Sequence, residues 1–352
     1  MSQLDLFATE PEESPAPPAP AAPVRRHLTD LPPAPTMTPA PTNRALRSVV
    51  PPAPPKLNHY RPVKRDPHQH AFEIAEAVSY AWHHHQGGDD ISVPIGTVAT
   101  LALWPLRGPD AYLGADWWLS LSDTDLMTAF RECWARWWIS RPDLIDRAAP
   151  LHTWLDGEEP PVRRGKAVRA VVEAALTRGL LHRTSSADAE TRSETDIMGA
   201  LVAVLRSKGS HDALAEVHTP PGMAELMARM LFSGTPLEPG MKFDEPAGGT
   251  GGLYRAAAQV MRESSIDPHD FGWCLTDIDP IAAAGAAVNA LLWDLGPHVL
   301  IACGDTLLDG NLQAKAAKEA RESILRRDRA HGQAVMLAAI RKVEALFEEK
   351  AA

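Results

Sequence analysis

Cysteine is scarce in this chain, and long apolar runs are missing. The three cysteines are Cys133, Cys274 and Cys303. They are far apart, odd in number and without metal-ligand spacing, which argues against a disulfide framework and points to a reducing cytoplasm. No window approaches the roughly 18 consecutive apolar residues of a membrane-spanning helix, and the N-terminus lacks the apolar core of a signal peptide. We therefore expect a cytoplasmic protein with no membrane segment and no metal site.

An excess of basic residues is also lacking. Lysine and arginine number 35 against 45 aspartates and glutamates, and the net charge is −10. A free-standing nucleic-acid binder usually carries a basic face, which this balance does not indicate. Contact with DNA would need a local patch or a partner subunit that supplies the charge. The apolar share of 45% allows a sizeable core, and 352 residues suit two domains with a tail.

The first part of the chain has the composition of an extended tail. Residues 1–66 include "PEESPAPPAPAAPVRR" and "LPPAPTMTPAPTNR" and hold about half of all the prolines. Proline removes backbone donors and favours extended polyproline conformations, and few residues here are able to build a core. We predict that residues 1–66 form a disordered, proline-rich tail.

Residues 67–211 are predicted to form a mostly helical module. Apolar residues recur at the helical spacing of three to four in 71–85 and 123–139, and 165–183 and 195–209 add two more helices. Ser122 or Asp123 is suited to cap the second of these. The tryptophans of this region are expected to pack its core rather than to stack on a ligand; they include Trp117, Trp118, Trp134, Trp137 and Trp138.

A run of three histidines, His83 to His85, does not predict a metal site. Successive residues on a helix point in different directions, so the three imidazoles cannot all face one ion. We expect an exposed polar helix end.

The pattern becomes α/β in residues 212–311. A helix over 219–232 begins with proline in its first turn, a favoured position. Strands ending on acidic residues are predicted within 240–246, 271–280 and 298–307, and helices within 253–263 and 281–296. Strands alternating with helices indicate a parallel sheet. Residues 312–352 read only as helix, a solvated amphipathic pair. The expected fold class is α/β: a helical N-terminal module followed by an incomplete Rossmann-like domain and C-terminal helices.

The stretch "FDEPAGGTGGLYRAAAQVM" predicts a ligand-binding loop between the first strand and its helix. In an open α/β sheet, ligands bind at the carboxyl ends of the strands, and glycines let the backbone approach them closely. A phosphate-binding loop would end in Gly-Lys-Ser/Thr, but this loop ends in Gly-Gly-Leu-Tyr. A dinucleotide fingerprint needs a third glycine where Tyr254 stands.

Acidic residues near three successive strand ends favour S-adenosylmethionine as the ligand. The cofactor carboxylate would use backbone amides of the loop and the helix N-terminus. Its ammonium group needs a carboxylate nearby, and Asp244 is placed for that. Asp277 is suited to accept hydrogen bonds from the ribose hydroxyls, as acids at that place do in dinucleotide folds. Asp305 is suited to accept from the adenine amine.

The segment "DEPAGGTGGL" resembles the D-P-A-C/G-G-T-G-G-F/L loop of adenine-specific DNA methyltransferases, in particular the modification subunits of type I restriction systems. "HTPPGMAELMARML" is similar to the segment that lies over the methionine end of the cofactor in that family, and "LTDIDPIAAAGAAVNALL" and "GDTLL" are similar to its next two motifs. Glu245, His218 and Asp277 depart from the commonest form. The resemblance implies S-adenosyl-L-methionine as cofactor, bound through Thr219, Asp244, Pro246, Ala247, Gly248, Gly249, Gly251, Asp277 and Asp305.

The catalytic motif of that family, N/D/S-P-P-Y/F/W, does not occur in this sequence. Its polar side chain and proline carbonyl hold a target adenine flipped out of the duplex, and its aromatic ring stacks on the base. No catalytic residue is therefore predicted, and the family's later strands and target-recognition domain have no visible counterpart. Without the fourth strand, the first strand would become an open edge.

Three functional interpretations follow. The chain is a DNA adenine-N6 methyltransferase-like protein that binds the cofactor and is inactive alone. Alternatively, it is one half of a split DNA methyltransferase completed by a partner chain that also contacts DNA. A third interpretation is a non-enzymatic, DNA-associated interaction protein.

The N-terminal peptide Gln3-Leu4-Asp5-Leu6-Phe7 resembles the Q-L-S/D-L-F docking motif for the bacterial DNA polymerase sliding clamp. A proline-rich tail leaves these apolar side chains without a core of their own, so they are free to order on a partner. The resemblance implies that Gln3 hydrogen-bonds at the rim of the clamp pocket while Leu6 and Phe7 fill it, with Leu4 beside them. The tail would then tether the folded part to replicating DNA.

Overall fold

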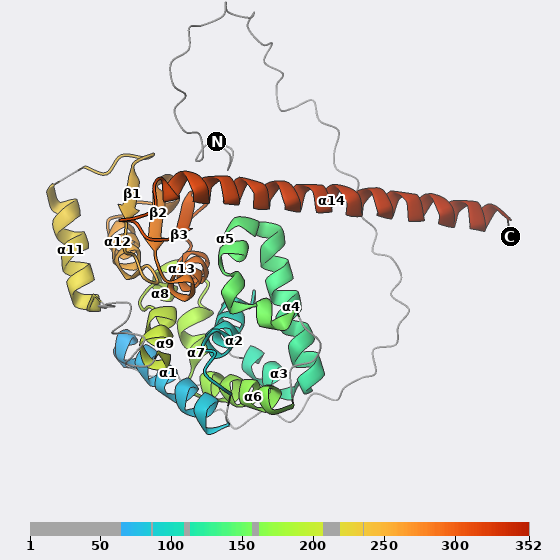
Figure 1. Ribbon diagram of the computed structural model, residues 1–352, viewed down its shortest axis with the longest axis horizontal. Helices are drawn as coiled ribbons and strands as arrows, with labels where there is room; N and C mark the ends of the chain where they lie inside the picture. Colours follow the sequence, from blue (N-terminus) through green and yellow to red (C-terminus); the bar gives the residue numbers. More distant parts are fainter. Residues whose placement is uncertain are drawn as a thin grey trace, which may run out of the picture. The chain divides into compact units, whose positions relative to one another are not determined.

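The computed structural model describes residues 65–85, 87–108, 113–156, 162–206, 219–234 and 236–351. Almost all of the predicted tail, including Gln3, Leu4, Leu6 and Phe7, lies outside these ranges. Within them the protein is mostly helical and carries one small parallel sheet (Figure 1).

The helical module has the predicted character, with helices that begin at recognisable caps. The Asp66 carboxylate accepts the Gln69 N–H and Pro67 opens the first helix, while Ser122 caps the helix that follows it, as predicted. The module consists of α1 (Pro67–His84), α2 (Ser92–Leu103), α3 (Leu113–Ser120), α4 (Asp123–Ser140), α5 (Pro142–Arg147), α6 (Val162–Thr177), α7 (Leu180–Thr184), α8 (Ala189–Arg192) and α9 (Ile197–Leu205), with the short 3-10 turns η4 (Ala149–Leu151) and η5 (Thr153–Leu155).

Helix α2 lies at the centre of this module. Every residue from Val93 to Leu103 is buried, which fits its apolar sequence on all sides. The helix contacts α6 and η4 most extensively. Gly96 permits the close approach to η4: a Cβ atom there would lie 1.8 Å from the backbone carbonyl oxygen of Leu151.

The tryptophans and histidines of the module behave largely as predicted. Trp118 and Trp134 are buried, and Trp117 is partly exposed but stacks on Trp104. The three residues from His83 to His85 are exposed at the end of α1. These side chains therefore have structural or solvent-facing positions.

The second half of the described chain forms the sheet. Its strands are parallel and in the order β1-β2-β3, so β1 is an edge strand as expected (Figure 1). The elements are α11 (Pro221–Gly234), β1 (Lys242–Glu245), α12 (Gly252–Glu263), the 3-10 turn η6 (Pro268–Asp270), β2 (Gly272–Asp277), α13 (Pro280–Leu292), β3 (Val299–Cys303) and α14 (Leu312–Ala351).

Helices cover the two faces of the sheet unequally. Side chains alternate between the faces along each strand. On one face, Trp273, Leu275, Val299 and Ile301 belong to the main core with α12 and α13. On the other face, Cys274, Leu300 and Ala302 pack against the first turns of α14; the helix side of that small core is Leu312, Ala316, Ala317, Ala320 and Ile324.

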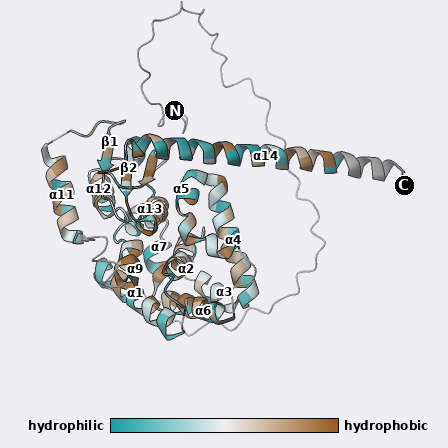
Figure 2. Cartoon of the chain, in the orientation of Figure 1, coloured by the Kyte–Doolittle hydropathy of each residue, from teal (hydrophilic) through white to brown (hydrophobic). Residues whose placement is uncertain are grey.

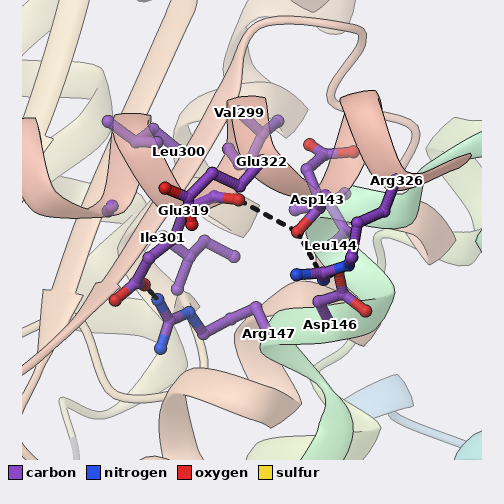
Figure 3. Close-up of a pocket in the computed structure, with 13 residues that line it drawn as sticks. Asp143, Leu144, Asp146, Arg147, Val299, Leu300, Ile301, Glu319, Glu322 and Arg326 are labelled. Atoms are coloured by element: carbon purple, nitrogen blue, oxygen red, sulfur yellow. Dashed lines mark hydrogen bonds and ion pairs between the residues drawn. The ribbon is translucent and has the colours of Figure 1, made fainter. Parts of the chain in front are cut away.

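The C-terminal segment is one helix, α14, and not the predicted pair. Its sequence from Leu312 to Ala351 holds no proline, and its only glycine is Gly332, so nothing breaks the helix. Ion pairs attach it to α5: Arg147 pairs with Glu319, and Arg326 pairs with Asp146. These side chains lie around a crevice of about 230 Å³ between α5, β3 and α14 (Figure 3).

The helical module and the sheet share one hydrophobic core. Residues of α1, α2, α6 and α9 belong to the same buried cluster as residues of α12, α13 and the strands. Helix α13 makes the connection, because it contacts α9, α2 and α5 as well as β2 and β3. None of the helices in the described ranges is both long and apolar enough to cross a membrane.

Candidate small-molecule site at the glycine loop

A cavity of about 290 Å³ opens between the glycine loop and the helical module. This volume lies just below the range typical of small-molecule sites, about 300–1,000 Å³. Residues from α1, from the start of α9, from α11 and from the loop form its wall. The polar and loop residues among them are His68, Thr195, Asp196, Gly199, Thr219, Ala247, Gly248, Gly249, Thr250, Gly252 and Arg255.

Four of the predicted cofactor residues come together here. Thr219 lines the same cavity as the loop residues Ala247, Gly248 and Gly249. The sequence separates Thr219 from the loop by an entire helix and a strand. The two segments predicted to enclose the methionine part of the cofactor therefore share one cavity.

Five of the predicted cofactor residues do not line this cavity: Asp244, Pro246, Gly251, Asp277 and Asp305. Asp244 is exposed on β1. Strand β3 ends at Cys303, two residues before Asp305, whose carboxylate accepts the N–H groups of Leu307 and Leu308 in the following turn. The strand ends were therefore predicted to within one or two residues.

Asp277 holds the glycine loop in shape. One carboxylate oxygen accepts the N–H of Gly249 at 2.7 Å, and the other accepts the N–H of Asp279 at 2.8 Å. Gly249 and Gly251 have φ values of 55° and 93°, in the left-handed region that glycine adopts readily. The carboxylate predicted to contact a ribose thus already has two backbone partners, although each oxygen retains a further lone pair.

Asp196 connects the helical module to the loop. It caps α9 by accepting the Gly199 N–H at 2.7 Å, and it also accepts the Thr250 hydroxyl at 2.6 Å and the Asn289 side-chain amide at 2.7 Å. The Asn289 amide also donates to the Thr250 carbonyl at 2.9 Å. One carboxylate therefore joins the start of α9, the loop and the middle of α13.

A buried arginine, Arg255, also lines the cavity. The Arg255 side chain is 2% exposed; it pairs with Glu225 of α11 at 2.9 Å and donates to the carbonyl groups of Ser193 and Glu194. Burial would raise the pKa of Glu225, but the hydrogen bond and charge of Arg255 outweigh it and lower that pKa. Burial, together with Arg255, lowers the pKa of His68, which lies 3.5 Å from Glu225. His68 is therefore neutral at pH 7.

Two backbone amides at the start of α12 have no acceptor among the described residues. Gly252 and Leu253 begin α12 and line the cavity, and no described residue accepts their N–H groups. The first N–H groups of a helix carry partial positive charge and favour an anion. Gly252 has open space where a Cβ atom would lie. The two amides therefore suit a carboxylate, whereas the charge of Arg255 is already balanced by Glu225.

Glu245, at the end of β1, has a raised pKa. Burial raises the pKa of Glu245, and the charges of Asp244 and Asp277 raise it further. The pKa of Glu245 in the folded protein therefore exceeds its unfolded value, so its protonation is linked to stability. The protonated Glu245 side chain contributes its full stabilisation below the unfolded-state pKa. This stabilisation is lost as the pH rises through the pKa of the folded protein.

We expect Glu245→Gln to stabilise the protein at pH 7–8 and to have little effect near pH 4, because the amide removes a charge that burial and two carboxylates disfavour. The measurement is the melting temperature across this pH range for the parent and the variant. Glu263→Gln on α12 serves as the control, and its ion pair with Arg229 predicts no gain at pH 7. Equal melting temperatures of parent and Glu245→Gln at every pH would contradict the interpretation.

No cluster of three or more potential metal ligands occurs within the described ranges. Comparison with protein-family models, curated proteins and solved structures finds no match to this chain. The case for a function therefore depends on the residues of the site itself.

The wall residues that sequence reasoning missed come mainly from the helical module. His68 and Asp196 have no motif around them, and only their position against the loop shows their connection to it. Asn289, which supports Asp196 from behind the wall, has a weak signal in the sequence, because a polar residue in the otherwise apolar helix α13 needs a buried partner.

Proposed function

We propose that this protein binds S-adenosyl-L-methionine in the cavity between the glycine loop and the helical module. The observation that carries the proposal is the shared wall of Thr219 and the loop residues Ala247, Gly248 and Gly249. These are the two segments with the family resemblance, and the fold supports their proximity. The proposed architecture is the first half of a Rossmann-like methyltransferase domain.

The donor set fits the amino-acid end of this cofactor. The N–H groups of Gly252 and Leu253 and the helix N-terminus behind them would bind the carboxylate. Asp277 fixes the loop in the conformation that presents them, through Gly249. Glycine is needed at Gly248 as well, because a Cβ there would lie 2.4 Å from the Leu275 side chain. The bound cofactor would supply a methyl group activated by its sulfonium.

A more specific proposal concerns the reaction in which the bound cofactor would take part. The resemblance favours a DNA adenine-N6 methyltransferase-like role, and the N-P-P-aromatic motif is missing from the sequence. We propose that the chain by itself transfers no methyl group to DNA. A second polypeptide carrying that motif would be needed for catalysis.

Titration calorimetry with S-adenosylmethionine tests the binding proposal. We expect the parent to bind and Asp277→Ala to weaken binding at least about tenfold, because hydrogen bonds to a charged acceptor are worth about 1.5–3 kcal/mol each. Asp328→Ala on α14 is the matched control, since Asp328 pairs only with its neighbour Arg327 in the described structure. Absence of binding by the parent, or equal affinity of parent and Asp277→Ala, would refute the assignment.

A further inference from the structure

Among the described residues, the most extensive unpartnered surface lies at the β1 edge of the sheet and on α11. Along α11, five large apolar side chains recur at helical spacing and are each about half exposed or more: Met223 at 51%, Leu226 at 52%, Met227 at 48%, Met230 at 67% and Leu231 at 57%. The opposite face of the helix packs Ala224 and Ala228 against α12. Helix α11 therefore has exposed apolar side chains beyond its contact with α12. Hydrophobic residues recur along this helix in Figure 2.

This apolar face adjoins the open strand edge. The ring of Phe232, near the end of α11, lies 5.8 Å from the ring of Phe243 in β1. Phe243 is on the sheet face that α12 covers, because it also contacts Trp273. Helix α11 thus lies on the α12 side of the sheet, next to β1.

The open edge of β1 exposes the backbone of two particular residues. Met241 accepts the Gly272 N–H, so its carbonyl points toward β2. Backbone groups alternate in direction along a strand, so those of Phe243 also point toward β2, and those of Lys242 and Asp244 point toward the open edge. The side chains of Lys242 and Asp244 share the opposite sheet face from Phe243 and are exposed.

We propose that two copies of this chain associate through antiparallel pairing of their β1 strands. A two-fold axis perpendicular to the sheet would pass between the two Phe243 residues. Residues that pair across an antiparallel ladder must lie on the same face. Of the registers that this rule allows, the proposed one sets Phe243 against its counterpart and Lys242 against Asp244 of the other copy. The outward backbone groups of Lys242 and Asp244 then form the hydrogen-bonded pairs.

Charge complementarity favours a second copy as the occupant of this edge. Lys242 and Asp244 carry opposite charges and have no ion-pair partner among the described residues. In the proposed register, Lys242 of each copy is directly opposite Asp244 of the other copy, so the two-fold axis gives two pairs of opposite charges. The same axis places the two α11 helices beside each other on the α12 face, where their methionine and leucine side chains cover one another. The dimer would have a continuous sheet of two three-stranded halves.

The experiment is the mass of the full-length chain in solution without cofactor, measured by light scattering and sedimentation at about 1–100 μM. We expect a dimer of the 38.2 kDa chain. Lys242→Asp places aspartates opposite each other at both sites, so the dissociation constant should rise at least about tenfold. The double variant Lys242→Asp with Asp244→Lys restores opposite charges across the axis and should recover the parent's affinity.

Two further variants separate the effect of net charge from that of the apolar face of α11. Lys166→Asp on α6 changes the net charge equally at an exposed site away from β1 and should leave the dimer intact. Replacing Met230 and Leu231 with glutamate should give a folded monomer with an unchanged circular dichroism spectrum. A monomeric parent over the whole concentration range would overturn the proposal, as would a dimer unaffected by Lys242→Asp or not recovered by the charge exchange. A parent that associates only with a different polypeptide would overturn it as well.

Discussion

Asp196→Ala should lower the free energy of unfolding by about 3–5 kcal/mol. The substitution removes the cap of α9, worth about 1 kcal/mol, and leaves the Thr250 hydroxyl and one Asn289 amide hydrogen without their acceptor. Unsatisfied buried donors cost about 1–3 kcal/mol each. Asn289 is fully buried and does not line the cavity, so water does not easily replace the lost carboxylate at its amide. Urea denaturation of parent and variant measures the difference.

Asp188→Ala is the matched control for this prediction. Asp188 also caps a helix, accepting the Glu190 N–H at the start of α8, but its carboxylate makes no bond to the loop or to α13 in the described structure. Its loss should cost only the cap, about 0.5–2 kcal/mol. Similar losses for the two variants would show that the bonds from Asp196 to Thr250 and Asn289 contribute little.

Gly96→Ala should be destabilising by about 2 kcal/mol or more. The new Cβ would lie 1.8 Å from the Leu151 carbonyl oxygen and 3.0 Å from Trp154 Nε1, so α2 and η4 would have to move apart. Overpacking a core of this kind typically costs about 1–3 kcal/mol, and here a backbone atom is the obstacle. The expected loss exceeds the usual gain of alanine over glycine in a helix.

Gly165→Ala tests the same change without the clash. Gly165 lies in α6 with no atom within 4 Å of a Cβ position, so alanine should stabilise the protein by about 0.5–1 kcal/mol. The same glycine-to-alanine change is therefore expected to lower the free energy of unfolding at Gly96 and to raise it at Gly165. Thermal and urea unfolding of both variants measure these two changes. A neutral Gly96→Ala would mean that α2 is not in contact with η4 in solution.

The local features of the sheet region were predictable from the sequence. The alternating strands and helices and the glycine loop follow from residues close together in the chain. The same is true of the cap at Ser122 and of the exposed histidines from His83 to His85, because period and capping chemistry are short-range signals. The edge position of β1 was instead expected from the strand order of the family that the sequence resembles.

The features that depend on distant residues were not predictable. Asp196 is 54 residues from Thr250 and 93 from Asn289, and no local pattern reports these contacts. His68 has no motif around it. The prediction of two C-terminal helices was wrong because charge and apolar period vary along residues 312–352, whereas only a proline or a capping turn would have broken the helix.

Helix α14 has a mechanical consequence. Its first turns are held against β3 and α5, and Arg327 makes a last bond to the Ile139 carbonyl. Every residue from Asp328 to Lys342 is exposed, and the helix continues to Ala351. At about 1.5 Å per residue, this unsupported part is a rod roughly 35 Å long. A rigid helix of this length would hold a partner bound near Ala351 at a fixed distance from the sheet. Gly332 is the position at which the helix would bend most easily.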